Sequence, residues 1–98
     1  MAVTHLVFLR LRADADAAGI FASLAALRGV IPGLLSFSGG PNSSPEGLSG
    51  GYTHSFAMSF ADAAARDAYL PHPAHEAAKA LVLAGLEPGG VCVMDHDA

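Results

Sequence analysis

The sequence predicts an α+β domain in which a four-stranded antiparallel sheet carries its helices on one face, in split-βαβ topology. Strand-like and helix-like segments follow one another in the order β-α-β-β-α-α-β, and no internal repeat is visible. A chain of 98 residues has room for one hydrophobic core, so we expect a single domain over residues 1–98.

The first half of the chain supplies two strands, one helix and a loop. Residues 3–12 form an apolar strand, and because both of its faces are apolar in the middle, both should be covered. A helix capped by Asp14 or Asp16 should run to about Arg28. Residues 34–38 follow as a short strand. The segment GGPNSSPEGLSGG then predicts a loop over residues 39–51, because Gly and Pro are so dense there.

The second half supplies two strands and two helical pieces. Residues 52–60 alternate strictly between bulky and small side chains, which predicts a strand. Residues 61–70 predict a short helix, and Pro73 suits the first turn of a helix that continues to about residue 84. After a Pro-Gly-Gly turn at residues 88–90, the last strand is expected over residues 91–95.

Composition excludes several classes of protein. Five Lys plus Arg against nine Asp plus Glu give a net charge of −4, which argues against nucleic-acid binding. No apolar run approaches the length of a membrane-spanning helix, and the first residues lack the basic segment of a secretory signal. Cys92 stands alone in an apolar run, which indicates a buried thiol and fits a cytoplasmic location.

The low charge also suggests a face that needs a partner. Only 14% of residues are charged, while 52% are hydrophobic. The side chains on one face of the first strand, which include His5 and Leu9, should point toward the helices. Leu6 and Phe8, on the other parity, are then expected to need a second subunit. The strand at residues 52–60 offers only small or polar side chains to that interface.

Tyr69, His72 and His75 surround the break between the two helical pieces. A neutral imidazole can take a proton near neutral pH, and a phenol can donate a hydrogen bond to a developing oxyanion. Such a pair would run proton abstraction beside a carbonyl group without a metal or organic cofactor. The alternative is structural, because a buried histidine is often simply a hydrogen-bonded core residue.

A metal site is not expected. His5 and His54 each lie early in strands that should pair antiparallel, which places them toward opposite ends. His72 and His75 are separated by Pro73, and no third ligand is well placed beside them. The polar residues at the C-terminus read as a solvated tail, and the charged residues of the segment 61–68 read as an ordinary solvated helix face.

Several segments resemble the stress-responsive A/B barrel domain family, also called Dabb. They are the opening VTHLVFLRL strand, Ile31-Pro32-Gly33, Gly51-Tyr52-Thr53-His54 and, most specifically, Tyr69-Leu70-Pro71-His72-Pro73-Ala74-His75. The resemblance covers nearly the whole chain. It implies a ferredoxin-like domain that dimerises sheet against sheet into a dimeric α+β barrel, with a cavity between sheet and helices in each subunit.

The resemblance also implies roles for individual residues. One plant branch of the family consists of cofactor-free polyketide cyclases, which implies Tyr69 as hydrogen-bond donor and His75 as general base. The expected substrate-binding residues are His5, His54, Leu9, Phe56 and His72. The implied protein is a homodimer with a small apolar or aromatic ligand, no cofactor and cyclase or lyase activity.

Two departures from the cyclase branch leave the activity open. The chain has no Trp, and the helix after His75 is rich in alanine where bulk would shape a long apolar pocket. The alternative is a non-catalytic ligand-binding or stress-response protein with structural histidines. A related monooxygenase is disfavoured because no Asn-Trp pair is present.

Overall fold

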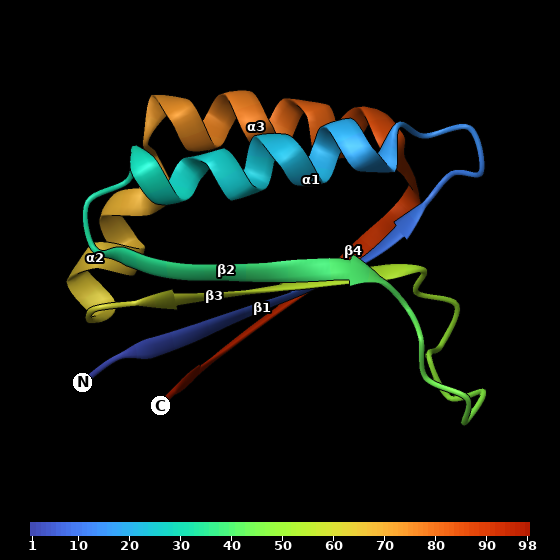
Figure 1. Cartoon of the computed structure of the whole chain (residues 1–98), viewed down its shortest axis with the longest axis horizontal. Helices are drawn as coiled ribbons and strands as arrows, with labels where there is room; N and C mark the ends of the chain where they lie inside the picture. Colours follow the sequence, from blue (N-terminus) through green and yellow to red (C-terminus); the bar gives the residue numbers. More distant parts are fainter.

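The computed structural model describes all 98 residues as one sheet covered on one side by helices. Figure 1 shows α1 and α3 lying over one face of the sheet, while no helix covers the opposite face. The elements are β1 (Val3–Leu11), α1 (Ala17–Ala26), a short 3-10 helix η1 (Leu27–Gly29), β2 (Leu34–Pro41), β3 (His54–Phe60), α2 (Ala63–Tyr69), α3 (Pro73–Gly85) and β4 (Leu86–Asp97). The antiparallel sheet has the order β2-β3-β1-β4, which confirms the predicted topology.

The register of the central strand β1 decides which side chains meet. His5 lies opposite Met58 of β3 on one side and opposite Asp95 of β4 on the other. His54 lies opposite Leu9, near the other end of β1. Residues that face each other in an antiparallel ladder share a face of the sheet, so His5 and Asp95 are neighbours while His5 and His54 are far apart.

The strand β2 is longer than predicted and continues through two glycines that the sequence assigned to a loop. Gly39 pairs with Phe56 in β3, and the ladder ends at Pro41. A β-carbon at Gly39 would lie 2.6 Å from the β-carbon of Phe56 and 2.7 Å from a ring carbon of Phe21. The glycine therefore allows two aromatic side chains to pack closely against the strand, which local propensity does not reveal.

The strand β4 is also longer than predicted, since it begins at Leu86 rather than at residue 91. Leu86 pairs with Leu11, and the register then shifts before Leu9 pairs with Val91. The predicted turn at residues 88–90 is thus an irregularity within the ladder, with Gly89 at φ 67°. A break in pairing of this kind absorbs extra residues without ending the strand.

The helices begin at side-chain caps and bury one stripe each. The carboxylate of Asp16, rather than that of Asp14, accepts from the backbone N–H of Gly19 at 3.0 Å. Asp62 caps α2 in the same way. The core between the layers includes Leu9, Met58 and Phe60. No helix combines the length and hydropathy that crossing a membrane requires.

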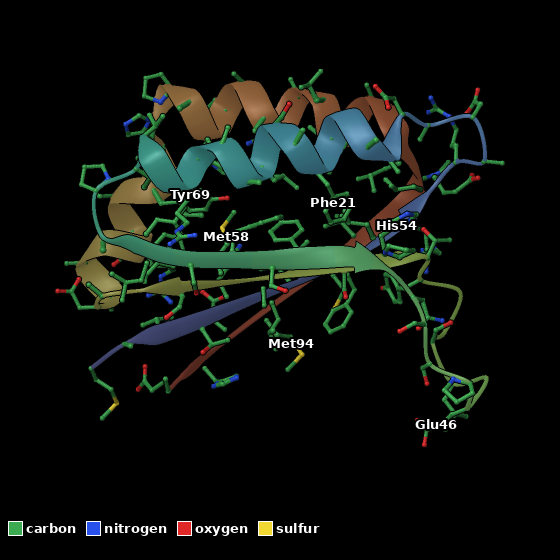
Figure 2. The ribbon with its side chains drawn as sticks, in the orientation of Figure 1. Phe21, Glu46, His54, Met58, Tyr69 and Met94 are labelled. Atoms are coloured by element: carbon green, nitrogen blue, oxygen red, sulfur yellow. The ribbon has the colours of Figure 1, made fainter.

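The uncovered face of the sheet carries apolar side chains in its middle, as the parity of β1 predicted. Leu6 lies opposite Met94, and Phe8 lies opposite Cys92, on the face that points away from the helices. Figure 2 shows Met94 below the sheet, on the side opposite Tyr69 and Met58. The prediction that Cys92 is buried is wrong for the single chain: it is half-buried, because nothing covers this face.

Candidate functional site

A cavity of about 360 Å³ lies between the sheet and α3, and most of its lining is apolar. Five residues singled out from the sequence line it: His5, Leu9, Phe56, Tyr69 and His75. Its walls come from β1, β3, β4 and all three α-helices, so only the folded chain assembles it. A cavity of this size and lining suits a small apolar molecule held by a few polar groups.

Tyr69 ends α2 and is 1% exposed. Its ring lies 4.1 Å from the ring of His75 and 5.9 Å from that of His5, between centroids. Its hydroxyl forms no hydrogen bond within the protein. Every fully buried polar side-chain atom does have a partner, so the hydroxyl is not fully buried and opens onto the cavity that Tyr69 lines. Burial raises the pKa of the Tyr69 phenol to about 12, so the group stays protonated and available as a donor.

His75 lies in the first turn of α3 with one nitrogen fixed by the backbone. Its Nδ1 lies 2.8 Å from the carbonyl oxygen of Leu70. Since a carbonyl oxygen only accepts hydrogen bonds, the proton of the neutral ring sits on Nδ1. The Nε2 atom is then a bare acceptor on a ring that packs against that of Tyr69. This arrangement leaves His75 able to take one proton from a bound molecule.

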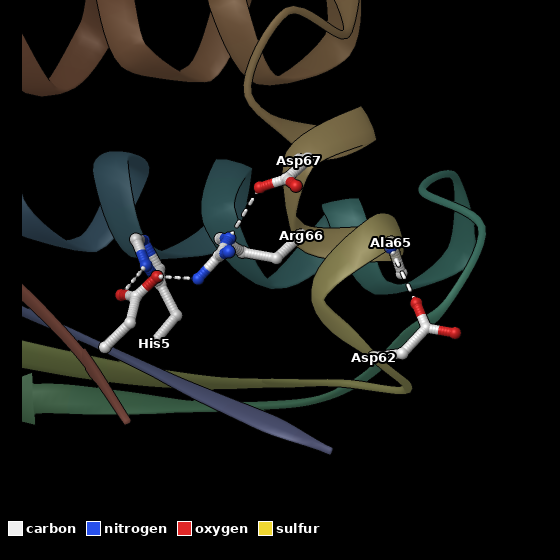
Figure 3. A network of polar contacts seen from close by, with 6 residues as sticks. His5, Asp62, Ala65, Arg66 and Asp67 are labelled. Carbon is white, nitrogen blue, oxygen red and sulfur yellow. Dashed lines mark hydrogen bonds and ion pairs between the residues drawn. The ribbon is translucent and has the colours of Figure 1, made fainter. Parts of the chain in front are cut away.

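His5 is held from the opposite side by a hydrogen bond to a carboxylate that is itself paired with an arginine. Its Nδ1 lies 2.7 Å from Oδ1 of Asp95, and Oδ2 of Asp95 accepts from Nη1 of Arg66 at 3.0 Å. Arg66 also donates from Nε to Asp67 at 2.9 Å (Figure 3). The hydrogen bonds to Asp67 and to Asp95 raise the pKa of the Arg66 guanidinium above its ordinary value.

The structure does not bring His54 and His72 to this cavity. His72 caps α3, where its Nδ1 accepts from the backbone N–H of Ala74 at 3.0 Å. His54 lies near the other end of the sheet, with its ring 5.7 Å from that of Phe21 and its Nδ1 2.8 Å from the hydroxyl of Thr53. Both histidines are committed to local structure, so we leave them out of the proposed site.

Sequence reasoning missed Asp95 and Arg66. Asp95 was assigned to a solvated tail and Arg66 to a solvated helix face; the two side chains do reach solvent, but they also pair with each other beside His5. The signal for Asp95 is its register opposite His5, which becomes visible only once β4 is known to pair with β1. No group of three or more His, Cys, Asp or Glu side chains is arranged to hold a metal ion.

Comparison with solved structures shows close likeness over the whole chain. A dimeric ferredoxin-like protein of unknown function from Jannaschia sp. is 32% identical, with both chains fully covered and a TM-score of 0.87. A protein from Arabidopsis thaliana is 27% identical over 98% of this chain and 94% of its own, with a TM-score of 0.88. A hydroxynitrile lyase from Passiflora edulis is 20% identical over 97% and 91%, with a TM-score of 0.86. The ferredoxin-like fold is thereby confirmed.

No curated protein matches the chain. A family model does, and it spans nearly all of the fold described above. The model of the stress-responsive A/B barrel domain matches residues 3–97, from the first residue of β1 to the last residue of β4. This chain therefore belongs to the stress-responsive A/B barrel domain, or Dabb, family.

Proposed function

We propose that this protein binds a small apolar or aromatic carbonyl compound in the cavity and performs cofactor-independent aldol-type chemistry on it, as a cyclase or lyase. The observation that carries the proposal is the packing of two cavity-lining rings, 4.1 Å apart between centroids: Tyr69, whose hydroxyl has no partner in the protein, and His75, whose Nε2 is bare. One group donates and the other accepts, and both meet at the end of an apolar cavity.

The chemistry needs only these two side chains. Nε2 of His75 takes a proton from the carbon beside a carbonyl group, and the electron pair moves onto the carbonyl oxygen. The Tyr69 hydroxyl donates a hydrogen bond to the enolate that forms. The enolate carbon attacks a second carbonyl of the same molecule, and the proton on His75 returns to the new alkoxide. In the lyase direction, His75 takes the hydroxyl proton, and the alkoxide becomes a carbonyl as the carbon–carbon bond breaks. The electron pair leaves with the departing carbon as an enolate, which Tyr69 stabilises and which takes the proton back from His75.

The likeness to the hydroxynitrile lyase supports testing the lyase direction first. Cleavage of a hydroxynitrile removes the proton of a hydroxyl group while a carbon–carbon bond to cyanide breaks, and on this chain Nε2 of His75 is the group that accepts such a proton. A naphthyl β-hydroxyketone that releases a fluorescent naphthaldehyde, and mandelonitrile, which releases benzaldehyde, are suitable probes for the two kinds of cleavage.

The test compares turnover of these probes by the native protein and three variants. We expect His75→Ala to lower kcat by about 10²–10⁴-fold and Tyr69→Phe by about 10²–10³-fold, because each removes one proton-transfer or oxyanion contact. His96→Ala removes an exposed histidine that points to the uncovered face of the sheet and does not line the cavity, and it serves as the matched control. Full activity in a folded His75→Ala variant would assign His75 to structure.

The second candidate is ligand binding without turnover, and the apolar lining of the cavity favours it. A neutral naphthyl ketone dye such as prodan fits this chemistry and reports binding by its fluorescence. Saturable binding that Tyr69→Phe weakens, together with no cleavage of either probe, would support the binding protein over the enzyme.

We also propose that two copies of the chain associate through the uncovered face of the sheet. The relative from Jannaschia sp. and another from Thermobifida fusca are described as dimeric. On this chain the same face carries Leu6, Phe8 and Met94, and Met94 is 61% exposed. A contiguous apolar face of this kind is more stable when a second copy covers it.

A further inference from the structure

We propose that His5 is a second proton acceptor of the cavity, and that Asp95 and Arg66 are positioning residues that aim its bare Nε2 at the bound molecule. The inference deepens the proposed function of the same site. It assigns to the cavity a substrate class with protons to exchange at two positions, such as an enolisable dicarbonyl compound.

The ring of His5 has one nitrogen engaged and one free. Its Nδ1 lies 2.7 Å from the carboxylate of Asp95, which only accepts hydrogen bonds, so the neutral ring carries its proton on Nδ1. Its Nε2 has no partner in the protein, although the residue is 6% exposed. Every fully buried polar side-chain atom has a partner, so Nε2, which has none, is not fully buried and opens onto the cavity that His5 lines.

The position of His5 complements that of His75. Tyr69 lies between the two imidazoles, with ring centroids 5.9 Å from His5 and 4.1 Å from His75. One phenol ring is therefore flanked by two imidazole rings, each of which has a bare nitrogen. A single acceptor suffices to remove one proton, whereas two acceptors around one donor suit a substrate that loses a proton at one position and exchanges a second at another.

Arg66 decides how Asp95 is held. The guanidinium group donates to Oδ2 of Asp95, while Oδ1 of the same carboxylate faces His5 (Figure 3). A carboxylate satisfies both neighbours, because both of its oxygens accept. An amide at this position cannot do so, since one end accepts and the other end donates.

This asymmetry gives a test of the tautomer that needs no catalytic activity. In Asp95→Asn, Arg66 can only donate, so the amide oxygen has to face Arg66 and the amide NH₂ has to face Nδ1 of His5. Nδ1 then becomes an acceptor, and the ring proton moves to Nε2. Adding Arg66→Leu frees the amide to turn its oxygen back to His5, which restores the proton on Nδ1.

The measurement is long-range proton–nitrogen NMR of the histidine rings, which distinguishes a protonated ring nitrogen from a bare one. We expect His5 with its proton on Nδ1 in the native protein, on Nε2 in Asp95→Asn, and on Nδ1 again in the double variant. His75, bonded to a carbonyl oxygen, and His72, whose Nδ1 accepts from Ala74, are internal references that stay unchanged in all three proteins.

The charged and titratable groups facing His5 are Asp95, with Arg66 behind it, and Tyr69, with His75 beyond. The residues that reach its ring from β3 are aromatic or aliphatic.

Each result decides one part of the proposal. A proton on Nε2 of native His5, or an unchanged tautomer in Asp95→Asn, would overturn it even if the protein cleaves the probes. If the tautomers behave as expected and neither probe is cleaved, the proposed reaction fails while the orientation of His5 stands. Where a probe is cleaved, we expect Asp95→Asn to lower kcat with little change in KM and the added Arg66→Leu to restore it. Unchanged kcat in Asp95→Asn would refute the role of His5 in proton transfer.

Discussion

Raising the pH through the titration of Tyr69 tests how dry the cavity is around the phenol. Burial raises the pKa of this group from 10.0 to about 12, because the phenolate would have to form beside apolar walls. The unfolded chain ionises first, so the stability that the neutral phenol contributes is fully present below about pH 10 and is lost as the pH rises toward about 12.

The size of the effect follows from the shift. Each pKa unit corresponds to about 1.4 kcal/mol, so the shift from 10.0 to about 12 sets an upper figure of roughly 2.7 kcal/mol once both states are ionised. Water can enter the cavity beside the ring and screens part of this difference. We therefore expect a measured loss on the order of 1–1.5 kcal/mol.

The chain makes the assay selective, because it has two tyrosines and no tryptophan. In Tyr52→Phe, the ultraviolet absorbance of phenolate reports Tyr69 alone. Urea unfolding at about pH 8 and about pH 11 then compares Tyr52→Phe with the double variant that also carries Tyr69→Phe, which lacks this part of the alkaline destabilisation. A Tyr69 phenol that titrates near the value of a free tyrosine would refute its burial in the apolar cavity.

Three further predictions concern assembly and stability. We expect Met94→Lys to dissociate the proposed homodimer in sedimentation velocity, whereas Leu81→Lys, at a residue 51% exposed on α3, leaves it intact; a dimer in both variants would exclude the uncovered sheet face as the interface. Removing the cap of α3 by His72→Ala should lower the free energy of unfolding by about 1 kcal/mol while His72→Asn retains most of it, and equal urea midpoints for the two variants would contradict the capping role. Gly33→Ala should destabilise by more than about 1 kcal/mol, because φ is 81° and the new methyl would lie 2.6 Å from a β-carbon of α2. Gly29→Ala has no neighbour within 4 Å and is the matched control in the same thermal melts.

The order of elements and the covered face of the sheet were predictable because they depend on local patterns. The parity of β1 places His5 and Leu9 toward the helices, and the alternation that ends at Phe60 places its bulky side chains in the core. The long β2 and β4 were not predictable. Gly39 pairs with Phe56 of β3, and Gly89 lies in the irregular stretch of β4 where its register with β1 shifts, so both placements depend on the neighbouring strand rather than on local propensity.

The candidate site also combines residues that the sequence could identify with residues that only the structure revealed. Tyr69 and His75 were identifiable because they flank one helix break, close together in the sequence. His54 was wrongly expected beside them, since its strand alternates correctly but its register sends it to the other end of β1. Asp95 and Arg66 were not identified from the sequence, because a carboxylate near the C-terminus and an arginine on a short helix are typical of solvated surface.

The sequence by itself determined which residues are apolar, where the helices are capped and which strand faces point inward, because periodicity and capping act over a few residues. Only the tertiary structure decided that Asp95 lies 2.7 Å from His5 and that Tyr69 stands between two imidazoles. The physical reason is the antiparallel pairing of β1 with β4, which brings together residues from the two ends of the chain. Hydrogen-bond roles at the site follow from that register, and therefore from long-range contacts that no local pattern records.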